Sequence, residues 1–209
     1  MSDCIPEADP LARARAGDPE ALGQLFLHFR DRLRKMVRLR LDRRLAGRVD
    51  PSDVLQEAFL DLSRRFPEYA ANPAVPFYLW LRALTGQRLI DLHRQHLGAQ
   101  MRDASQEVSI YRGGLPQASS EYLAEQLLGR MTSPTQAAIR AEMQVRLQEA
   151  LNSMEPLDRE VVVLRHFEEL NNNETAEVLG IDKSAASKRY IRAIRRLKAI
   201  LDAVPGFFD

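Results

Sequence analysis

Cysteine and long apolar runs are nearly missing from this sequence. Cys4 is the only cysteine among 209 residues, which excludes an intramolecular disulfide and a cysteine-rich zinc site. No run of about 18 apolar residues occurs, so we expect no membrane-spanning helix and no membrane insertion. The N-terminus lacks the basic-then-apolar pattern of a signal peptide. A cytoplasmic location is therefore expected.

Charge of one sign is not in excess either. The 30 Lys and Arg residues are balanced by 29 Asp and Glu, which gives a formal net charge of +1. Binding to nucleic acid would therefore depend on local basic patches. Alternating patterns typical of β-strands are short, whereas helical periodicity runs through most of the chain, with Gly and Pro between the periodic segments. We therefore predict an all-α fold of two small helical domains joined by a linker.

The stretch from Glu174 to Leu201 has the pattern of a helix-turn-helix. A first short helix, residues 172–179, is expected to end at Gly180, because glycine readily adopts the left-handed conformation of a helix C-terminus. A second helix is expected after Asp182, which is a suitable N-cap residue. Its narrow apolar stripe consists of Ala186, Tyr190, Ile194 and Leu197.

The second helix of this motif is strongly basic. Between Lys183 and Leu201 there are seven Lys or Arg residues and no Asp or Glu. Two helices joined by a tight glycine turn, the second one basic, match the geometry that fits the major groove of DNA. The alternative is an ordinary helical hairpin with a solvated cationic face. We favour DNA binding because the apolar, glycine and cationic positions coincide.

The N-terminal half begins with two expected helices, residues 7–16 and Pro19 to about Leu45. The second half of the longer helix is rich in arginine, from Arg30 to Arg44. Some of these cations could meet phosphates. A charge run on an amphipathic helix is usually its solvated face, however, and this is the interpretation we favour.

A third helix is expected to begin at Asp50-Pro51, where an N-cap residue precedes a first-turn proline, and to end at Pro67. Asp53, Gln56 and Glu57 lie at spacings of three and four on its outer side. This acidic and amide surface suits the docking of a basic partner helix. It suits a solvated helix face equally well.

Aromatic and basic residues are combined in the next helix, from Phe77 to about His96. The helix follows a loop, residues 67–76, and it has aromatic residues at its start and arginines further along. This combination is typical of single-stranded nucleic acid binding. For Trp80 we favour burial in the core. His93 lies three residues before His96, but no Asp, Glu or Cys is placed to complete a metal site. We interpret both histidines as surface residues and expect no metal and no cofactor.

Residues 97–134 contain Gly, Pro and Ser clusters and one short helical piece, so we predict a linker there. A capping box with proline, residues 133–136, then opens a helix to about Met154. Pro156 is expected to start the next helix. We interpret four acidic residues in and after that helix as capping and solvated charge: Asp158, Glu160, Glu168 and Glu169.

The order of the motifs resembles that of a known family. The C-terminal motif is DREVVVLRHFEELNNNETAEVLGIDKSAASKRYIRAIRRLK, and the N-terminal motifs are DPSDVLQEAFLDLSRRF and PFYLWLRALTGQRLIDLHRQH. Together they resemble a sigma factor of the extracytoplasmic-function (ECF) group of the sigma-70 family, over nearly the whole chain. The resemblance implies a transcription initiation subunit that is not an enzyme. It implies a promoter-melting domain in residues 1–96 and a minus-35-binding domain in residues 135–209.

The resemblance also implies partners and site residues. The implied partners are promoter DNA, core RNA polymerase through its clamp coiled coil and flap, and, as a candidate, an anti-sigma factor. Clamp docking is implied for Asp53, Gln56 and Glu57. Minus-10 recognition and melting are implied for Trp80, Gln87, Arg88 and Asp91, and minus-35 recognition for Ser184, Ser187, Lys188, Arg189, Ile191 and Arg192.

Two other classes of protein compete with this interpretation. A two-domain transcriptional regulator with a LuxR-like helix-turn-helix would share the C-terminal pattern, but its sensor domain would need a ligand pocket or a phosphoacceptor Asp on a βα scaffold. A recombinase or nuclease would need clustered metal-binding carboxylates or a nucleophile beside a base. The helical pattern of the N-terminal half lacks a βα scaffold, and neither a cluster of metal-binding carboxylates nor a nucleophile beside a base is visible in the sequence.

Overall fold

The structure is a computed structural model that describes residues 9–45, 47–97, 115–128 and 134–202, with side chains for all of them except 134–140 and 200. The described residues are helical and contain no β-strand, which confirms the predicted all-α fold. They form two compact units. Residues 9–38, 43–45 and 47–97 make up unit 1, and residues 39–42, 115–128 and 134–202 make up unit 2.

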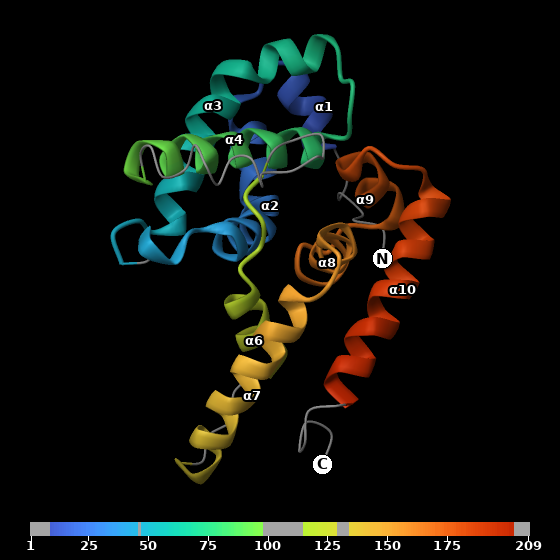
Figure 1. Ribbon diagram of the computed structural model, residues 1–209. Helices are drawn as coiled ribbons and strands as arrows, with labels where there is room; N and C mark the ends of the chain where they lie inside the picture. Colours follow the sequence, from blue (N-terminus) through green and yellow to red (C-terminus); the bar gives the residue numbers. More distant parts are fainter. Residues whose placement is uncertain (1–8, 46, 98–114, 129–133, 203–209) are drawn as a thin grey trace. The chain divides into compact units, whose positions relative to one another are not determined.

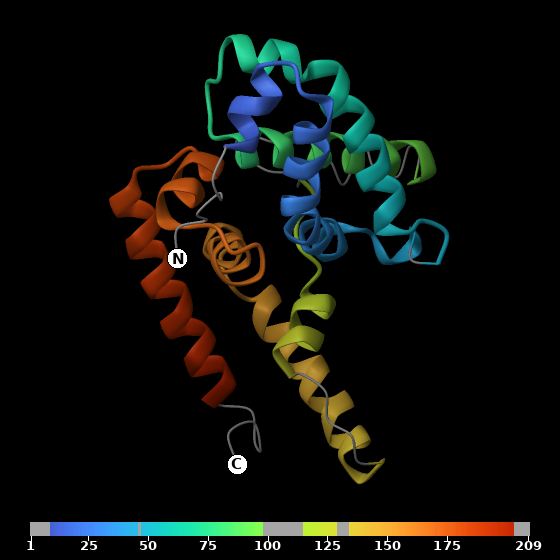
Figure 2. The same cartoon turned by 180° about the vertical axis from the view of Figure 1, so that it is seen from behind.

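Unit 1 consists of α1 (Pro10–Arg15), most of α2 (Pro19–Arg40), the 3₁₀ turn η1 (Arg43–Leu45), α3 (Pro51–Ala71) and α4 (Phe77–Leu97). In Figure 1, α3 and α4 lie side by side, and Figure 2 shows α1 and α2 from the opposite side. Aromatic rings fill the core between these helices: Phe26 lies 5.0 Å from Phe59, and Phe29 lies 5.1 Å from Tyr78, between ring centroids.

The long helix α2 is shorter than predicted. It begins at Pro19, where the carboxylate of Asp18 accepts hydrogen bonds from the backbone N–H groups of Glu20 and Ala21. It ends at Arg40, and the expected continuation to Leu45 is wrong. Its last two side chains, Leu39 and Arg40, are buried in unit 2. Arg40 is therefore not part of a solvated face.

Pro67 does not end α3, although this was the expectation. The helix continues to Ala71 with Pro67 inside it. An internal proline costs about 3 kcal/mol, but Phe66 and Tyr69 on either side of it are both buried. Burial of these two aromatic side chains, at about 1.5–3 kcal/mol each, offsets that cost. The loop before α4 is consequently reduced to residues 72–76.

Unit 2 contains α6 (Ser120–Leu128), α7 (Pro134–Asn152), α8 (Pro156–Val162), the π-helical turn η2 (Val163–Phe167), α9 (Asn172–Leu179) and α10 (Lys183–Asp202). Figure 1 shows α6 lying along α7. The proline of the expected capping box opens α7, whereas the side chains of that box lie outside the described ones. The buried core joins α6, α7, α8 and α10 through Leu123, Leu147, Val162 and Leu197, among others.

Residues 115–128 fall within the predicted linker, and the structure places them in unit 2. The N–H of Ser119 donates to the carbonyl oxygen of Leu39 over 2.8 Å. Arg159 donates to the hydroxyl of Ser120 over 2.7 Å, and its own pKa is lowered by burial. The same guanidinium donates to Asn152 at the end of α7 over 3.2 Å. This part of the chain is therefore held to α7 and α8 by side-chain hydrogen bonds.

The fold changes one expectation about a polar residue. His93 is only 2% exposed, so its interpretation as a surface residue is wrong, whereas His96 is exposed. Among the described residues, no group of three or more His, Cys, Asp or Glu could hold a metal ion. None of the described helices has the length and hydropathy that crossing a bilayer requires.

Candidate nucleic-acid interface

The helix-turn-helix has the bounds that the sequence predicts. The side chain of Asn171 caps α9 by accepting from the N–H groups of Asn173 and Glu174, and Glu174 accepts from the N–H of Asn171 in return. This is a capping box. Gly180 ends the helix in the left-handed conformation, with φ 63° and ψ 35°. Ile181 then donates to the carbonyl of Ala176 over 3.0 Å, which closes the turn before α10.

One face of α10 is buried and the opposite face is exposed. Ala186, Ala193 and Leu197 are buried, whereas Tyr190 and Ile194 are half-buried. Ile191 is 48% exposed, which is unusual for a large apolar side chain. Of the residues implied in minus-35 recognition, the exposed ones are Ser184, Ser187, Lys188, Ile191 and Arg192, and Arg189 is half-buried. All six therefore lie on one helix, and five of them are accessible to a ligand.

Two of the implied recognition residues are already paired within unit 2. Arg192 donates through Nε and Nη2 to the two carboxylate oxygens of Asp158, each over 2.6 Å. Arg189 donates to Asp158 over 3.1 Å and to Glu155 over 2.9 Å. Asp158 is only 5% exposed, so its interpretation as solvated charge is wrong.

The electrostatics of Asp158 follow from these contacts. Burial acts to raise the pKa of Asp158, but the hydrogen bonds from Arg192 and Arg189 outweigh it, so the pKa of Asp158 lies below its ordinary value. The same hydrogen bond to Asp158 raises the pKa of Arg192. The carboxylate therefore stays ionised beside both guanidinium groups.

A second contact ties α10 to the preceding helices through Tyr190. Its hydroxyl lies 2.8 Å from Nε2 of His166, and the guanidinium of Arg165 lies 5.0 Å from the centre of its ring. His166 is exposed, but partial loss of its hydration beside its neighbours, and then the charge of Arg165, lower its pKa. A neutral imidazole beside Tyr190 is therefore favoured at neutral pH.

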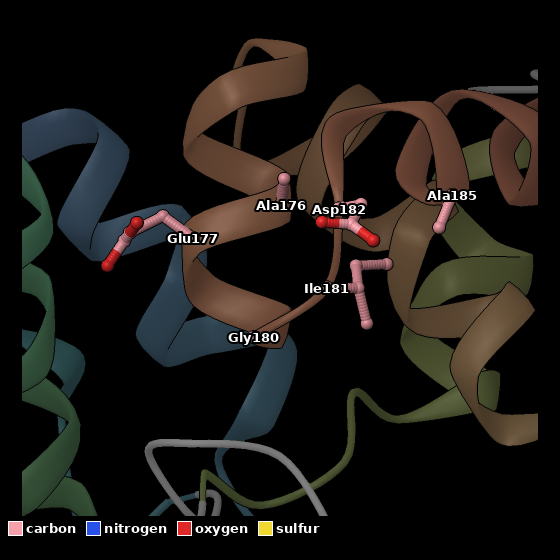
Figure 3. Close-up of a pocket in the computed structure, with 6 residues that line it drawn as sticks. All are labelled: Ala176, Glu177, Gly180, Ile181, Asp182 and Ala185. Atoms are coloured by element: carbon pink, nitrogen blue, oxygen red, sulfur yellow. The ribbon is translucent and has the colours of Figure 1, made fainter.

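The turn of the motif borders an open pocket lined by Ala176, Glu177, Gly180, Ile181, Asp182 and Ala185. Figure 3 shows the carboxylate of Glu177 pointing away from Asp182 and Ala185. The two acidic side chains therefore do not converge on one point. The lining is otherwise small and apolar, and it does not form a cluster of polar groups around a small molecule.

In unit 1, the start of α4 is joined to the end of α3 by aromatic contacts. The ring of Tyr69 is stacked on that of Trp80, with 4.5 Å between centroids. The hydroxyl of Tyr69 donates to the carbonyl of Val75 over 2.9 Å, which holds the loop of residues 72–76 against the helices. Trp80 is half-buried, so it is more accessible than the core position we favoured.

The other three residues implied in melting lie further along α4. Arg88 pairs with Asp61 of α3 through both carboxylate oxygens. Hydrogen bonds from Arg88 lower the pKa of Asp61, and the same bond raises the pKa of Arg88. Gln87 is exposed and donates to Asp91 over 3.0 Å. These side chains line one side of α4 and are partly engaged with neighbours.

The three residues implied in docking on polymerase lie on the outer side of α3. Asp53, Gln56 and Glu57 are all exposed, and none is used by the core of unit 1. Asp53 has a second role, because its carboxylate accepts from the N–H of Asp50 over 3.1 Å in the capping box that opens α3. Gln56 and Glu57 make no side-chain hydrogen bond within the described part of the chain.

Four site-bordering residues were missed by reasoning from sequence: Glu155, Asp158, Asp61 and Tyr69. Asp61 and Asp158 were visible as acidic residues on helices, but no local pattern shows which arginine each one meets. Asp61 lies 27 residues from Arg88, and Asp158 lies 34 residues from Arg192. Such pairs form only after distant helices pack together.

Comparisons with known proteins identify the family. The family model described as "ECF sigma factor" matches residues 8–201. The ECF RNA polymerase sigma factor SigD of Mycobacterium tuberculosis is 28% identical over 191 residues, which cover 90% of this chain and 80% of SigD. The RNA polymerase sigma factor CnrH of Cupriavidus metallidurans is 29% identical over 196 residues, which cover 92% of each chain.

A solved structure shows the same fold. The structure of CnrH in complex with the cytosolic domain of CnrY aligns with a TM-score of 0.53 and 24% identity, covering 93% of this chain and 96% of that chain. The family match includes the N-terminal half, which does not favour a LuxR-like regulator with a separate sensor domain. The chain therefore belongs to the ECF sigma factor family, and it is a sigma factor that directs RNA polymerase to promoters.

Proposed function

We propose that the two units divide this task, with unit 2 reading the minus-35 duplex through α10 and unit 1 docking on core polymerase and opening the minus-10 element. The observation that carries the proposal is the face of α10. The helix follows a left-handed glycine turn and exposes Ser187, Lys188 and Ile191, while Ala186 and Ala193 lie buried on its opposite face. A helix presented in this way fits the major groove.

Each kind of exposed residue on α10 has its own contribution. Lys188, Arg195 and Lys198 are exposed cations that suit phosphate contacts, whose affinity falls as salt rises. Ser187 suits a hydrogen bond to a base edge, and the exposed side chain of Ile191 suits the methyl group of a thymine. Each good base contact discriminates by about 1–3 kcal/mol.

Unit 1 supplies the melting step in this proposal. An extruded base costs a few kcal/mol of lost stacking and pairing, which a receiving pocket has to offset. The half-buried Trp80 and the loop that Tyr69 holds offer an aromatic surface for such a base. Gln87, Arg88 and Asp91 follow on the same helix, where a separated strand would continue.

The proposed roles of the two units imply which molecules the chain binds. Core RNA polymerase performs the chemistry, the chain has no active site of its own, and both act on the chromosome in the cytoplasm. The exposed Gln56 and Glu57 are the proposed contact with the clamp coiled coil, and unit 2 is the proposed contact with the flap. The sigma factor CnrH has been solved in complex with another protein, the cytosolic domain of CnrY, which supports a protein partner besides polymerase here; the candidate for that partner is an anti-sigma factor.

The docking step is tested by reversing one charge. Glu57→Lys should abolish co-precipitation of the full chain with core polymerase, because an exposed carboxylate that faces a basic helix becomes a repelling cation. Asp31→Lys is the matched control, since Asp31 is also an exposed acid of unit 1 but lies on α2. The control should bind polymerase like the unchanged chain.

The whole proposal is tested by transcription from promoters found by sequencing the DNA that the chain binds in the cell. The folded chain with core polymerase should give transcripts that start at those promoters, and Glu57→Lys should not. If the folded, unchanged chain gives no promoter-specific transcript with core polymerase, the proposal is wrong. If Glu57→Lys still co-precipitates, the docking surface is elsewhere.

A further inference from the structure

The carboxylate of Asp158 lies between two arginines of α10. Its two oxygens accept hydrogen bonds from Nε and Nη2 of Arg192, and one of them also accepts a hydrogen bond from Nη1 of Arg189. Its side chain is 7% exposed, whereas that of Arg192 is 59% exposed. Glu155, the N-cap residue of α8, accepts hydrogen bonds from both arginines as well, over 2.9 Å and 3.2 Å. Glu155 and Asp158, at the start of α8, therefore hold Arg189 and Arg192 of α10 by hydrogen bonds.

The geometry at Arg192 is that of a fork. Two parallel hydrogen bonds of 2.6 Å fix both the position and the plane of the guanidinium. Nη1 of Arg192 takes part in no hydrogen bond within the described part of the chain. This nitrogen is thus free to bind a ligand, while the opposite edge of the same group is held by a nearly buried carboxylate.

The charges around this fork matter as much as its geometry. Glu155 and Asp158 carry two negative charges, which offset those of Arg189 and Arg192. The four groups together therefore add little to the attraction of phosphates. What Arg192 retains is a donor in a fixed orientation, which is the property that base recognition needs.

We propose that Asp158, assisted by Glu155, is a positioning residue that orients Arg192 and Arg189 for reading the minus-35 element and that suppresses their binding to DNA of any sequence. This inference rests on the proposed function, in which α10 faces the minus-35 duplex. Asp158 itself does not touch the DNA in this proposal. Its effect is to lower the affinity for DNA of any sequence and to raise the discrimination between sequences.

Two other roles for Asp158 give different results. If the ion pairs only hold α10 on α8, removing them lowers the affinity for every DNA sequence together with stability. If Asp158 competes with DNA for the arginines, removing it raises the affinity for the chosen sequence as much as for others or more. Only a positioning role raises non-specific affinity while lowering discrimination.

The test uses Asp158→Asn in the full chain assembled with core polymerase. A duplex selected from a randomised pool by the unchanged assembly is compared with a scrambled duplex, and discrimination is the ratio of the two dissociation constants. Asp158→Asn should lower discrimination about tenfold, because an oriented guanidinium contact is lost. It should also strengthen binding to the scrambled duplex and steepen its salt dependence by about one to two phosphate contacts, because two cations are released.

Controls separate orientation from net charge. Glu149→Gln removes the same charge from an exposed acid of α7 whose side chain forms no hydrogen bond or ion pair with the described residues, and it should leave discrimination unchanged. In a background that carries both Arg189→Ala and Arg192→Ala, Asp158→Asn should have no further effect on discrimination. Thermal unfolding shows that each variant is folded. If a variant does not fold, the more conservative Asp158→Glu, which keeps the charge, should retain most of the discrimination.

The possible outcomes distinguish this inference from the function it rests on. If the unchanged assembly selects no sequence at all, the proposed minus-35 reading fails. If it selects a sequence and Asp158→Asn discriminates equally well or better, the positioning role is overturned and the minus-35 reading stands. An equal loss of affinity for both duplexes also overturns the positioning role.

Discussion

Arg88 and Asp61 join α4 to α3 by two parallel hydrogen bonds between one guanidinium and one carboxylate. The side chains are 34% and 13% exposed, so the pair lies at the edge of the unit 1 core. Arg88 is one of the residues proposed to act in promoter melting. A residue of the proposed site thus also holds two helices of the scaffold together, which leads to the first prediction.

Asp61→Asn should destabilise unit 1 by about 1 kcal/mol, because a charge-assisted, two-point contact becomes a weaker one. The pKa of Asp61 is lowered in the folded state. Its contribution is therefore fully present above the unfolded value of about 3.9, and it is lost as pH falls through the lower folded value. Unfolding curves between neutral and acidic pH should show the two proteins converging at low pH. Asp31→Asn, at an exposed acid of α2, should show no such convergence.

Arg40→Met should destabilise unit 2 by about 3–5 kcal/mol, because it leaves carboxylates without their cation in a buried place. Arg40 forms ion pairs with Glu160 and Glu168, and the side chains of Arg40 and Glu168 are both 0% exposed. Chemical denaturation measures the loss. Addition of Glu168→Gln to Arg40→Met should recover part of it, since one buried charge is then removed. A loss below about 1 kcal/mol would show that the pair contributes no more than a surface salt bridge.

Gly180→Ala should destabilise the helix-turn-helix by about 1–2 kcal/mol, because a Cβ atom is disfavoured in the left-handed conformation. Gly180 has φ 63° and ψ 35° at the end of α9. Gly180→Asn should be tolerated better, since asparagine adopts this conformation more readily than alanine. Thermal unfolding of the three proteins gives the comparison. Equal stability of the alanine and glycine proteins would contradict the prediction.

Tyr69→Phe should loosen the loop before α4 and cost about 1 kcal/mol, because the hydrogen bond to the carbonyl of Val75 is lost while the ring remains. Trp80 is the only tryptophan of the chain, so tryptophan fluorescence reports on the surroundings of this side chain alone. Tyr69→Phe should leave that emission nearly unchanged, whereas Tyr69→Leu should shift it by removing the stacked ring. An equal shift for both variants would mean that the hydroxyl, and not the ring, sets the environment of Trp80.

Local signals were sufficient for the elements that depend on neighbours in sequence. The helix of residues 172–179, the left-handed Gly180 and the start of α3 after Asp50 all follow from capping and turn chemistry within a few residues. The exposure of Ser187 and Lys188 follows from the apolar stripe on the other side of α10. These features can therefore be predicted from the sequence alone.

The errors share one cause, which is burial decided at long range. Pro67 was expected to end α3, but the aromatic core accepts both Phe66 and Tyr69 around it. Arg40, Asp158 and Glu168 were interpreted as solvated charge, and each is buried beside an opposite charge. Arg40 meets Glu160 across 120 residues of sequence. Helical periodicity shows which side of a helix is apolar, but it does not show which cation a buried carboxylate meets.

Periodicity, capping residues and a one-sided run of cations were thus enough to predict an all-helical chain with a helix-turn-helix; the likeness to an ECF sigma factor came instead from the resemblance of its motifs to those of the family. The reason is that these patterns express interactions between residues three or four positions apart. The packing of α8 against α10 decided something else, namely that Arg189 and Arg192 reach the exposed face already held by Asp158 and Glu155. Since the energy of a charge depends on the groups around it in space, only the folded chain could show whether those arginines act as free cations or as oriented donors.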